Sequence, residues 1–231
     1  MTEKPVKSKI VKLLKEKACL KQDIFDLTQK IFSDFREILR GVSIEYAGEI
    51  TKKDKRVIVE FRDKGPHQCE LRVGGDLLIF YMHTNVFEFD RSHAMWKTGY
   101  VQEDETRSYC GMIMIYNFLH DSFKYNRPAD IGYLIGRVFI NKDRHFFVDG
   151  KQHLGFVHND FIHEKLGSKE IRSVVDHAIL YRQAFDLYQP PYHHLKQISV
   201  GEIQEAGSNM QIRTGKRLGF RFSSDPPETG E

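Results

Sequence analysis

The sequence predicts an α+β fold: an antiparallel multi-stranded sheet built from two meanders, packed by an N-terminal and a C-terminal amphipathic helix. Apolar residues recur at helical spacing near both ends of the chain, and between the ends they alternate with polar residues around tight turns. Strand and helix patterns do not alternate as βαβ units, and neither the dinucleotide-binding nor the P-loop glycine motif occurs. We therefore expect no Rossmann or P-loop core.

Residues 6–40 have the period of an amphipathic helix. Its apolar positions are Ile10, Leu13, Leu20, Ile24, Leu27, Ile31 and Ile38. Gly41 is a natural C-terminal stop for this helix. An unbroken helix of this length would span about 50 Å, which exceeds the width of a compact domain of this size. We expect either a break near residues 19–22 or a first half that projects.

Three roles are open for this helix. It can lie on its own sheet, or its nearly seven-residue repeat can form a coiled-coil-like seam for self-association or for docking of a protein partner through residues 6–40. Lysines beside the apolar positions also permit a helix on a membrane surface. That third role is less favoured, because Trp is absent from the helix and acidic residues accumulate from Asp23 onward.

The first meander follows the helix. Strand patterns at residues 57–62 and 69–73 flank the turn formed by residues 63–67. Pairing about Pro66 predicts the partners Phe61–Leu71, Val59–Val73, Arg62–Glu70 and Glu60–Arg72. A second turn at residues 74–75 leads into residues 76–82, which are apolar on both sides and predict a central strand.

The second meander lies further along the chain. Residues 108–119 favour a strand over a helix, and strands are predicted at 133–140, 145–148 and 151–157. Asp149-Gly150 indicates a type I′ turn before the last of these. A helix is expected over about 169–188, ended by Pro190, with short edge strands at 198–203 and 210–222.

These elements give three parts. Residues 1–41 form the N-terminal amphipathic helix, residues 42–222 the antiparallel α+β domain, and residues 223–231 a flexible acidic tail.

Composition and cysteine usage limit the class of protein. Hydrophobic residues make up 40% of the chain and charged residues 29%, which is typical of a soluble globular protein. No apolar run approaches the ~20 residues of a transmembrane helix, and the charged N-terminus is not a secretory signal. Cys19, Cys69 and Cys110 are too few and too scattered for a disulfide scaffold or a closed zinc site. A cytoplasmic location is the expectation.

Positive charge gathers near both ends of the chain. Residues 1–21 hold seven lysines against two glutamates, and residues 206–222 hold Arg213, Lys216, Arg217 and Arg221 with no acidic residue. Such ends can bind phosphates, so one alternative function is nucleic-acid binding with base stacking on Trp96, Phe220 or Phe222. A solvated helix face explains the same charges without a ligand.

The loop of residues 91–107 contains the candidate binding residues. They are Arg91, His93, Trp96, Lys97 and Tyr100, an aromatic and cationic group that could stack a ring and neutralise an anion. The alternative is that Trp96 folds back over the sheet edge as packing.

A second candidate site joins Asp130 to Asp149 and Lys151. This set faintly resembles the metal-binding motif of restriction-endonuclease-like nucleases, which implies Mg²⁺ on the two carboxylates and a water oriented by the lysine. A hairpin turn explains Asp149-Gly150 equally well.

A third candidate is the histidine-rich stretch of His153, His158, Asp160 and His163, whose imidazole and carboxylate groups could bind zinc or another transition metal. His158 and His163 are five positions apart, however, and share a helix face poorly.

The function expected from the sequence is therefore a non-catalytic soluble binding module that acts through the loop surface and the N-terminal association helix. Nucleic-acid binding and a metal-dependent nuclease or hydrolase at Asp130, Asp149 and Lys151 are the alternatives. The sequence identifies no cofactor.

Overall fold

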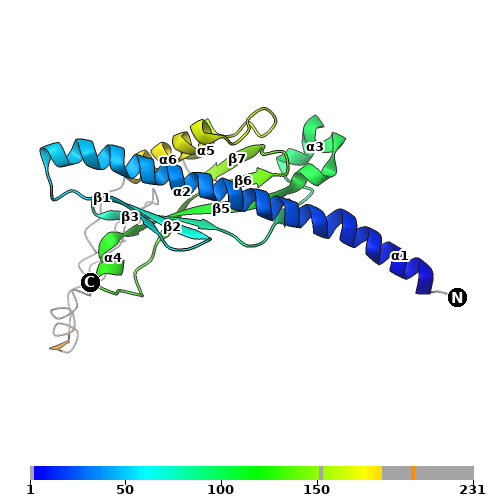
Figure 1. The fold of residues 1–231 in the computed structure, drawn as a ribbon, viewed down its shortest axis with the longest axis horizontal. Helices are drawn as coiled ribbons and strands as arrows, with labels where there is room; N and C mark the ends of the chain where they lie inside the picture. Colours follow the sequence, from blue (N-terminus) through cyan, green and yellow to red (C-terminus); the bar gives the residue numbers. More distant parts are fainter. Residues whose placement is uncertain (1–2, 151–152, 184–198, 201–231) are drawn as a thin grey trace, which may run out of the picture.

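The computed structural model describes residues 3–150, 153–183 and 199–200. The described chain begins with one long helix. This helix consists of α1 (Glu3–Leu13), a π-helical segment η1 (Leu14–Ala18) and α2 (Cys19–Lys53). Figure 1 shows α2 lying across the sheet and α1, in dark blue, extending well beyond it. The first half of the helix therefore projects, and no break occurs at residues 19–22.

The helix also continues past Gly41, so the stop predicted there is wrong. Val42 and Ser43 are buried, and Tyr46 packs against the core, so the next turns of the helix still have a surface to cover. Gly41 itself is exposed and is not among the glycines with positive φ, so it adopts no helix-ending conformation. The helix ends at Lys53, where Asp54 is extended and its N–H donates to the Ile50 carbonyl.

The sheet is antiparallel throughout and has the order β1-β2-β3-β5-β6-β7, with β4 paired to β5. Its strands are β1 (Val59–Asp63), β2 (Gln68–Val73), β3 (Asp76–Met82), β4 (Phe87–Glu88), β5 (Tyr109–Leu119), β6 (Tyr133–Asn141) and β7 (Phe146–Gly150). Strand β5 pairs with β3 on one side and β6 on the other, so the two predicted meanders are joined into one sheet. The α+β class and the strand at residues 109–119 are confirmed.

The register of the first hairpin is confirmed as well. Phe61 lies opposite Leu71 and Val59 opposite Val73, with the charged pairs Arg62–Glu70 and Glu60–Arg72 between them. The closest ion pair of Arg62, however, runs along its own strand to Glu60, at 2.8 Å.

Both faces of the sheet are covered, and side chains alternate between them. On one face, α2 and α6 (Ser168–Gln183) bury the main core, which includes Phe146 and Val148 of β7. Phe147, between these two residues, belongs instead to a smaller cluster on the opposite face, which we call the second-face cluster. Its buried members are Met95, Val101, Cys110, Met112, Phe139, Phe147 and Phe161.

The strand predicted at residues 151–157 is wrong. Strand β7 continues through Asp149 and Gly150, so these residues form no type I′ turn, and the chain then enters the short helix α5 (His153–Val157). Leu154 is fully buried, and a Cβ added at Gly136 would lie 2.6 Å from its Cδ2 atom. The small residues of β6 and β7 thus leave room for a helical turn to pack directly on the sheet.

The C-terminal helix is present as α6 up to Gln183. Beyond it only residues 199 and 200 are described, so the strands predicted at 198–203 and 210–222, the basic segment 206–222 and the tail 223–231 lie outside the described residues. Among the helices of the described ranges, none combines the length and apolar character required to cross a membrane.

Candidate functional site

The largest group of exposed apolar side chains on the long helix lies on α1 and η1, which we call the projecting helix (Glu3–Ala18). Val6, Ile10, Leu13 and Leu14 share one face by their spacing and are 58%, 51%, 53% and 56% exposed. We call these four residues the apolar stripe. Every residue from Val6 to Cys19 is exposed, and no other described element covers the stripe (Figure 1).

The π-helical segment changes the direction in which the apolar stripe faces. An α-helix turns about 100° per residue, so one extra residue in a turn rotates the following face by about that angle. The apolar stripe, which ends at Leu14 where η1 begins, is therefore rotated relative to the buried face of α2, which begins at Ile24. The sequence pattern placed Leu13 and Ile24 in one stripe, because the period alone does not reveal a π-helical turn between them.

Lysines flank the apolar stripe. The projecting helix contains six lysines and two glutamates, a net charge of +4, whereas the rest of the chain has a net charge of −1. Lys12 forms an ion pair with Glu16 at 3.9 Å, but Lys7, Lys9 and Lys15 have no ion-pair partner among the described residues. The projecting helix is therefore both apolar on one face and strongly basic around it.

The base of the projecting helix is attached to the sheet at β4 and β5. The ammonium of Lys17 lies 3.5 Å from Oε2 of Glu88 and 5.4 Å from the ring centroid of Tyr109. The hydroxyl of Tyr109 donates to the same Glu88 carboxylate at 2.6 Å. The projecting helix thus leaves the body next to Glu88 and Tyr109.

The 91–107 loop, predicted as a binding surface, forms the short helices η2 (Ala94–Lys97), α3 (Gly99–Glu103) and η3 (Glu105–Ser108). Trp96 packs against the second-face cluster, and its indole N–H donates to the Phe89 carbonyl at 3.0 Å. The Arg91 guanidinium lies 3.6 Å from the Trp96 ring centroid and pairs with Glu105 at 2.8 Å. Lys97 is exposed, with no ion-pair partner among the described residues. Among the five predicted residues, a cation–π contact therefore joins only Arg91 and Trp96.

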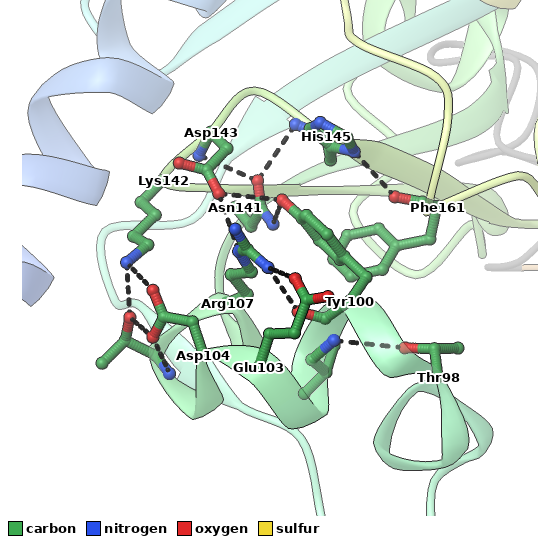
Figure 2. A network of polar contacts seen from close by, with 12 residues as sticks. Thr98, Tyr100, Glu103, Asp104, Arg107, Asn141, Lys142, Asp143, His145 and Phe161 are labelled. Atoms are coloured by element: carbon green, nitrogen blue, oxygen red, sulfur yellow. Dashed lines mark hydrogen bonds and ion pairs between the residues drawn. The ribbon is translucent and has the colours of Figure 1, made fainter.

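Tyr100 lies in a separate polar network that joins α3 and η3 to the β6–β7 turn (Figure 2). Its hydroxyl donates to Asp143 at 2.9 Å and accepts from Asn141 at 3.0 Å, and its ring stacks on His145 at 4.6 Å. Burial raises the pKa of the Tyr100 hydroxyl to about 12. Every polar group of this side chain is used within the protein.

The same network contains a strong carboxylate–ammonium pair. Lys142 Nζ lies 2.5 Å from Asp104, which also accepts from the Thr106 hydroxyl and N–H and thereby caps η3 (Figure 2). The hydrogen bond from Lys142, followed by that from Thr106, lowers the pKa of Asp104 to about 2. The network fixes the loop to the turn of the sheet.

His93 lines an open groove over the second-face cluster, of about 710 Å³, which we call the aromatic groove. Its lining includes Phe89, Phe139, Phe147, Phe161, Arg137 and Asp149. His93 accepts the Met95 N–H through Nδ1 at 3.3 Å and stands 4.6 Å from the Phe89 ring. The groove has the size of a small-molecule pocket, but its rim charges are already paired.

The two aspartates of the nuclease-like set have separate partners. Nε of Arg137 donates to Asp149 at 2.9 Å on the adjacent strand, while Asp130 accepts from Ser122 at 2.6 Å and pairs with Arg127 at 3.1 Å. Lys151 lies outside the described residues. Within those residues no group of three His, Cys, Asp or Glu side chains is placed to hold a metal ion.

A cluster that sequence reasoning missed surrounds Ser173 of α6. Its hydroxyl lies 3.2 Å from Nε2 of His158 and 3.3 Å from Nδ1 of His177, while Glu164 stands 4.0 Å from the other ring nitrogen of His158. Burial lowers the pKa of His158. The order resembles an acid–base–nucleophile triad, but the Glu164 distance exceeds a hydrogen bond and the backbone N–H of Ser173 is committed within α6. We assign the cluster to packing of α6 on the preceding segment.

Comparison with known protein-family models, curated proteins and solved structures found no match. The function is therefore argued from the geometry of this chain.

Proposed function

We propose that this chain is a non-catalytic binding module in which a rigid α+β body presents the projecting helix to a partner. The observation that carries the proposal is the apolar stripe, whose four side chains are each more than half exposed on a helix held away from the body. Contiguous exposed apolar surface of this kind is typical of interaction sites.

Only the first part of residues 6–40 has an exposed apolar face. From Ile24 onward the apolar face of the helix is buried on its own sheet, whereas residues 6–19 are exposed. A seam through the whole of residues 6–40 would require α2 to leave the core, so the docking segment in this proposal is the projecting helix alone.

The test uses the full chain carrying Ile10→Ser and Leu14→Ser. Three measurements are made: mass by light scattering over a concentration series, binding to anionic vesicles, and gel shift with nucleic acid at low salt. We expect the double variant to lose at least one interaction that the wild type has, because it removes half of the apolar stripe.

The matched control is Ile44→Ser with Leu180→Ser, which removes two apolar side chains of 69% and 64% exposure outside the projecting helix. This control should behave as wild type. If the stripe variant also matches wild type in all three measurements, the binding-module proposal is wrong.

The nucleic-acid alternative rests on the lysines of the projecting helix alone, because residues 206–222 lie outside the described part. It requires a gel shift that weakens steeply as salt is added. The serine variants should leave this shift unchanged, because lysine contacts to phosphates do not involve the apolar stripe.

A further inference from the structure

We infer that the partner of the projecting helix is an anionic lipid surface, on which the helix lies with its apolar stripe in the interface and its lysines against the headgroups. This inference rests on the proposed function, because it names the partner of the same docking segment.

The arrangement of lysines around the apolar stripe is typical of a helix that lies in a membrane interface. A helix that lies in a membrane interface has a basic polar face and an aliphatic opposite face. Lys7 and Lys9 follow Val6 by one and three positions, and Lys12 and Lys15 lie on the side of the helix away from the stripe by their spacing. The anionic headgroups surrounding such a helix would meet these ammonium groups while the stripe is withdrawn from water.

The acidic residues that disfavour a membrane-surface helix lie outside the projecting helix. Acidic residues from Asp23 onward count against a membrane-surface helix if residues 6–40 act as a unit. The structure divides the helix at η1, and the acidic residues from Asp23 onward lie on α2, whose apolar face is buried on the sheet. The projecting helix itself carries only two acidic residues, Glu3 and Glu16.

The charge of the projecting helix disfavours a second copy of the chain as its partner. Two projecting helices packed along their stripes would bring together two segments of net charge +4. Like charges flanking such a seam oppose pairing, whereas an anionic surface neutralises them.

The experiment is cosedimentation of the full chain with vesicles of phosphatidylcholine alone and of phosphatidylcholine mixed with phosphatidylserine. We expect binding only to the mixed vesicles, with a partition coefficient that falls as salt is added. Ile10→Ser with Leu14→Ser should lower the coefficient at least about tenfold, and so should Lys7→Gln, Lys9→Gln and Lys15→Gln combined.

Each variant has a matched control. Ile44→Ser with Leu180→Ser controls the apolar change, and Lys52→Gln, Lys53→Gln and Lys55→Gln remove the same charge from exposed positions at the other end of the long helix. Both controls should sediment as wild type. Equal losses in the two lysine triples would show that net charge alone drives binding and would overturn the inference.

An independent readout comes from Cys19, which is exposed at the base of the projecting helix while Cys69 and Cys110 are buried. An environment-sensitive dye on Cys19 should shift to the blue with mixed vesicles and remain unshifted with soluble polyglutamate. A shift with polyglutamate would instead assign the site to acidic polypeptides.

The lipid inference and the proposed function fail in different ways. Absence of vesicle binding, together with self-association that the stripe variant abolishes, overturns the lipid surface but keeps the docking helix. Stripe variants that match wild type in every assay overturn both.

Discussion

Gly111 sets how closely α2 approaches the sheet. A Cβ added at this position would overlap the Thr28 hydroxyl and would lie 2.9 Å from the Thr28 Cβ atom. Thr28 is itself buried, and its hydroxyl donates to the Ile24 carbonyl at 2.7 Å, so it has no free direction in which to move.

We therefore expect Gly111→Ala to lower the free energy of unfolding by about 1–3 kcal/mol through overpacking. Urea denaturation measures it. Gly41→Ala is the control: that glycine is exposed within α2, with no heavy atom within 4 Å of an added Cβ, and the change should stabilise by about 0.5–1 kcal/mol. Equal effects at the two positions would contradict the close approach of α2 to β5.

Single residues were also where the sequence was least informative about the site. Trp96 and Tyr100 look alike as exposed loop aromatics, yet one lies beneath Arg91 and the other is hydrogen-bonded to the β6–β7 turn. Arg91 is close to Trp96 in sequence, but Asp143 lies 43 residues from Tyr100, so no local pattern reveals that second contact. Whether the loop binds a ligand stays a prediction.

At the scale of elements, the network of Figure 2 joins the loop helices to the sheet. Asp104 supplies both the cap of η3 and the carboxylate for Lys142. Its pKa is lowered to about 2, so its stabilising effect is present above the ordinary Asp value of about 4 and is lost as pH falls through 2.

Asp104→Asn should therefore cost about 0.5–1 kcal/mol at pH 7, as expected for a partly exposed pair. Urea unfolding of wild type and variant from neutral to acidic pH measures the difference, which should shrink as pH falls from about 4 to about 2. Lys142→Gln should cost a similar amount, and adding it to Asp104→Asn should cost little more. A difference that persists unchanged at the acid end would show that the carboxylate charge is not the cause.

Elements that follow from a local sequence pattern were predicted correctly, whereas elements whose formation depends on packing against other parts of the chain were not. The hairpin register followed from Pro66 and the alternation around it, which also fixes which side chains face the core. Helix α5 was missed, because its formation depends on space at Gly136 and Gly150, residues of a neighbouring surface. The extension of α2 beyond Gly41 was missed because it depends on the packing of Val42 and Tyr46 against the core.

At the scale of the whole molecule, α6 is tied to the first meander by Arg182 and Asp76. Their side chains are only 10% and 14% exposed and lie 2.5 Å apart, although they are 106 residues apart in sequence. This pair fastens the C-terminal helix to β3.

Arg182→Met should lower the free energy of unfolding by about 2–4 kcal/mol, because it leaves a mostly buried carboxylate without this partner. Thermal and urea denaturation give the value. Arg56→Met is the control, since the Arg56–Asp54 pair is exposed and should contribute less than about 1 kcal/mol. Equal costs for the two changes would mean that burial of the Arg182 pair adds nothing.

The position of α2 ahead of every strand that it covers has a consequence for synthesis. At about 5–20 residues per second, several seconds separate the emergence of Lys53 from that of Leu119, the end of the central strand β5. Phe35 lacks its ring partner Phe80 until β3 has emerged, and the sheet beneath α2 stays incomplete until β5 follows. The nascent chain is therefore most vulnerable to chaperone capture or to aggregation before its middle has been translated.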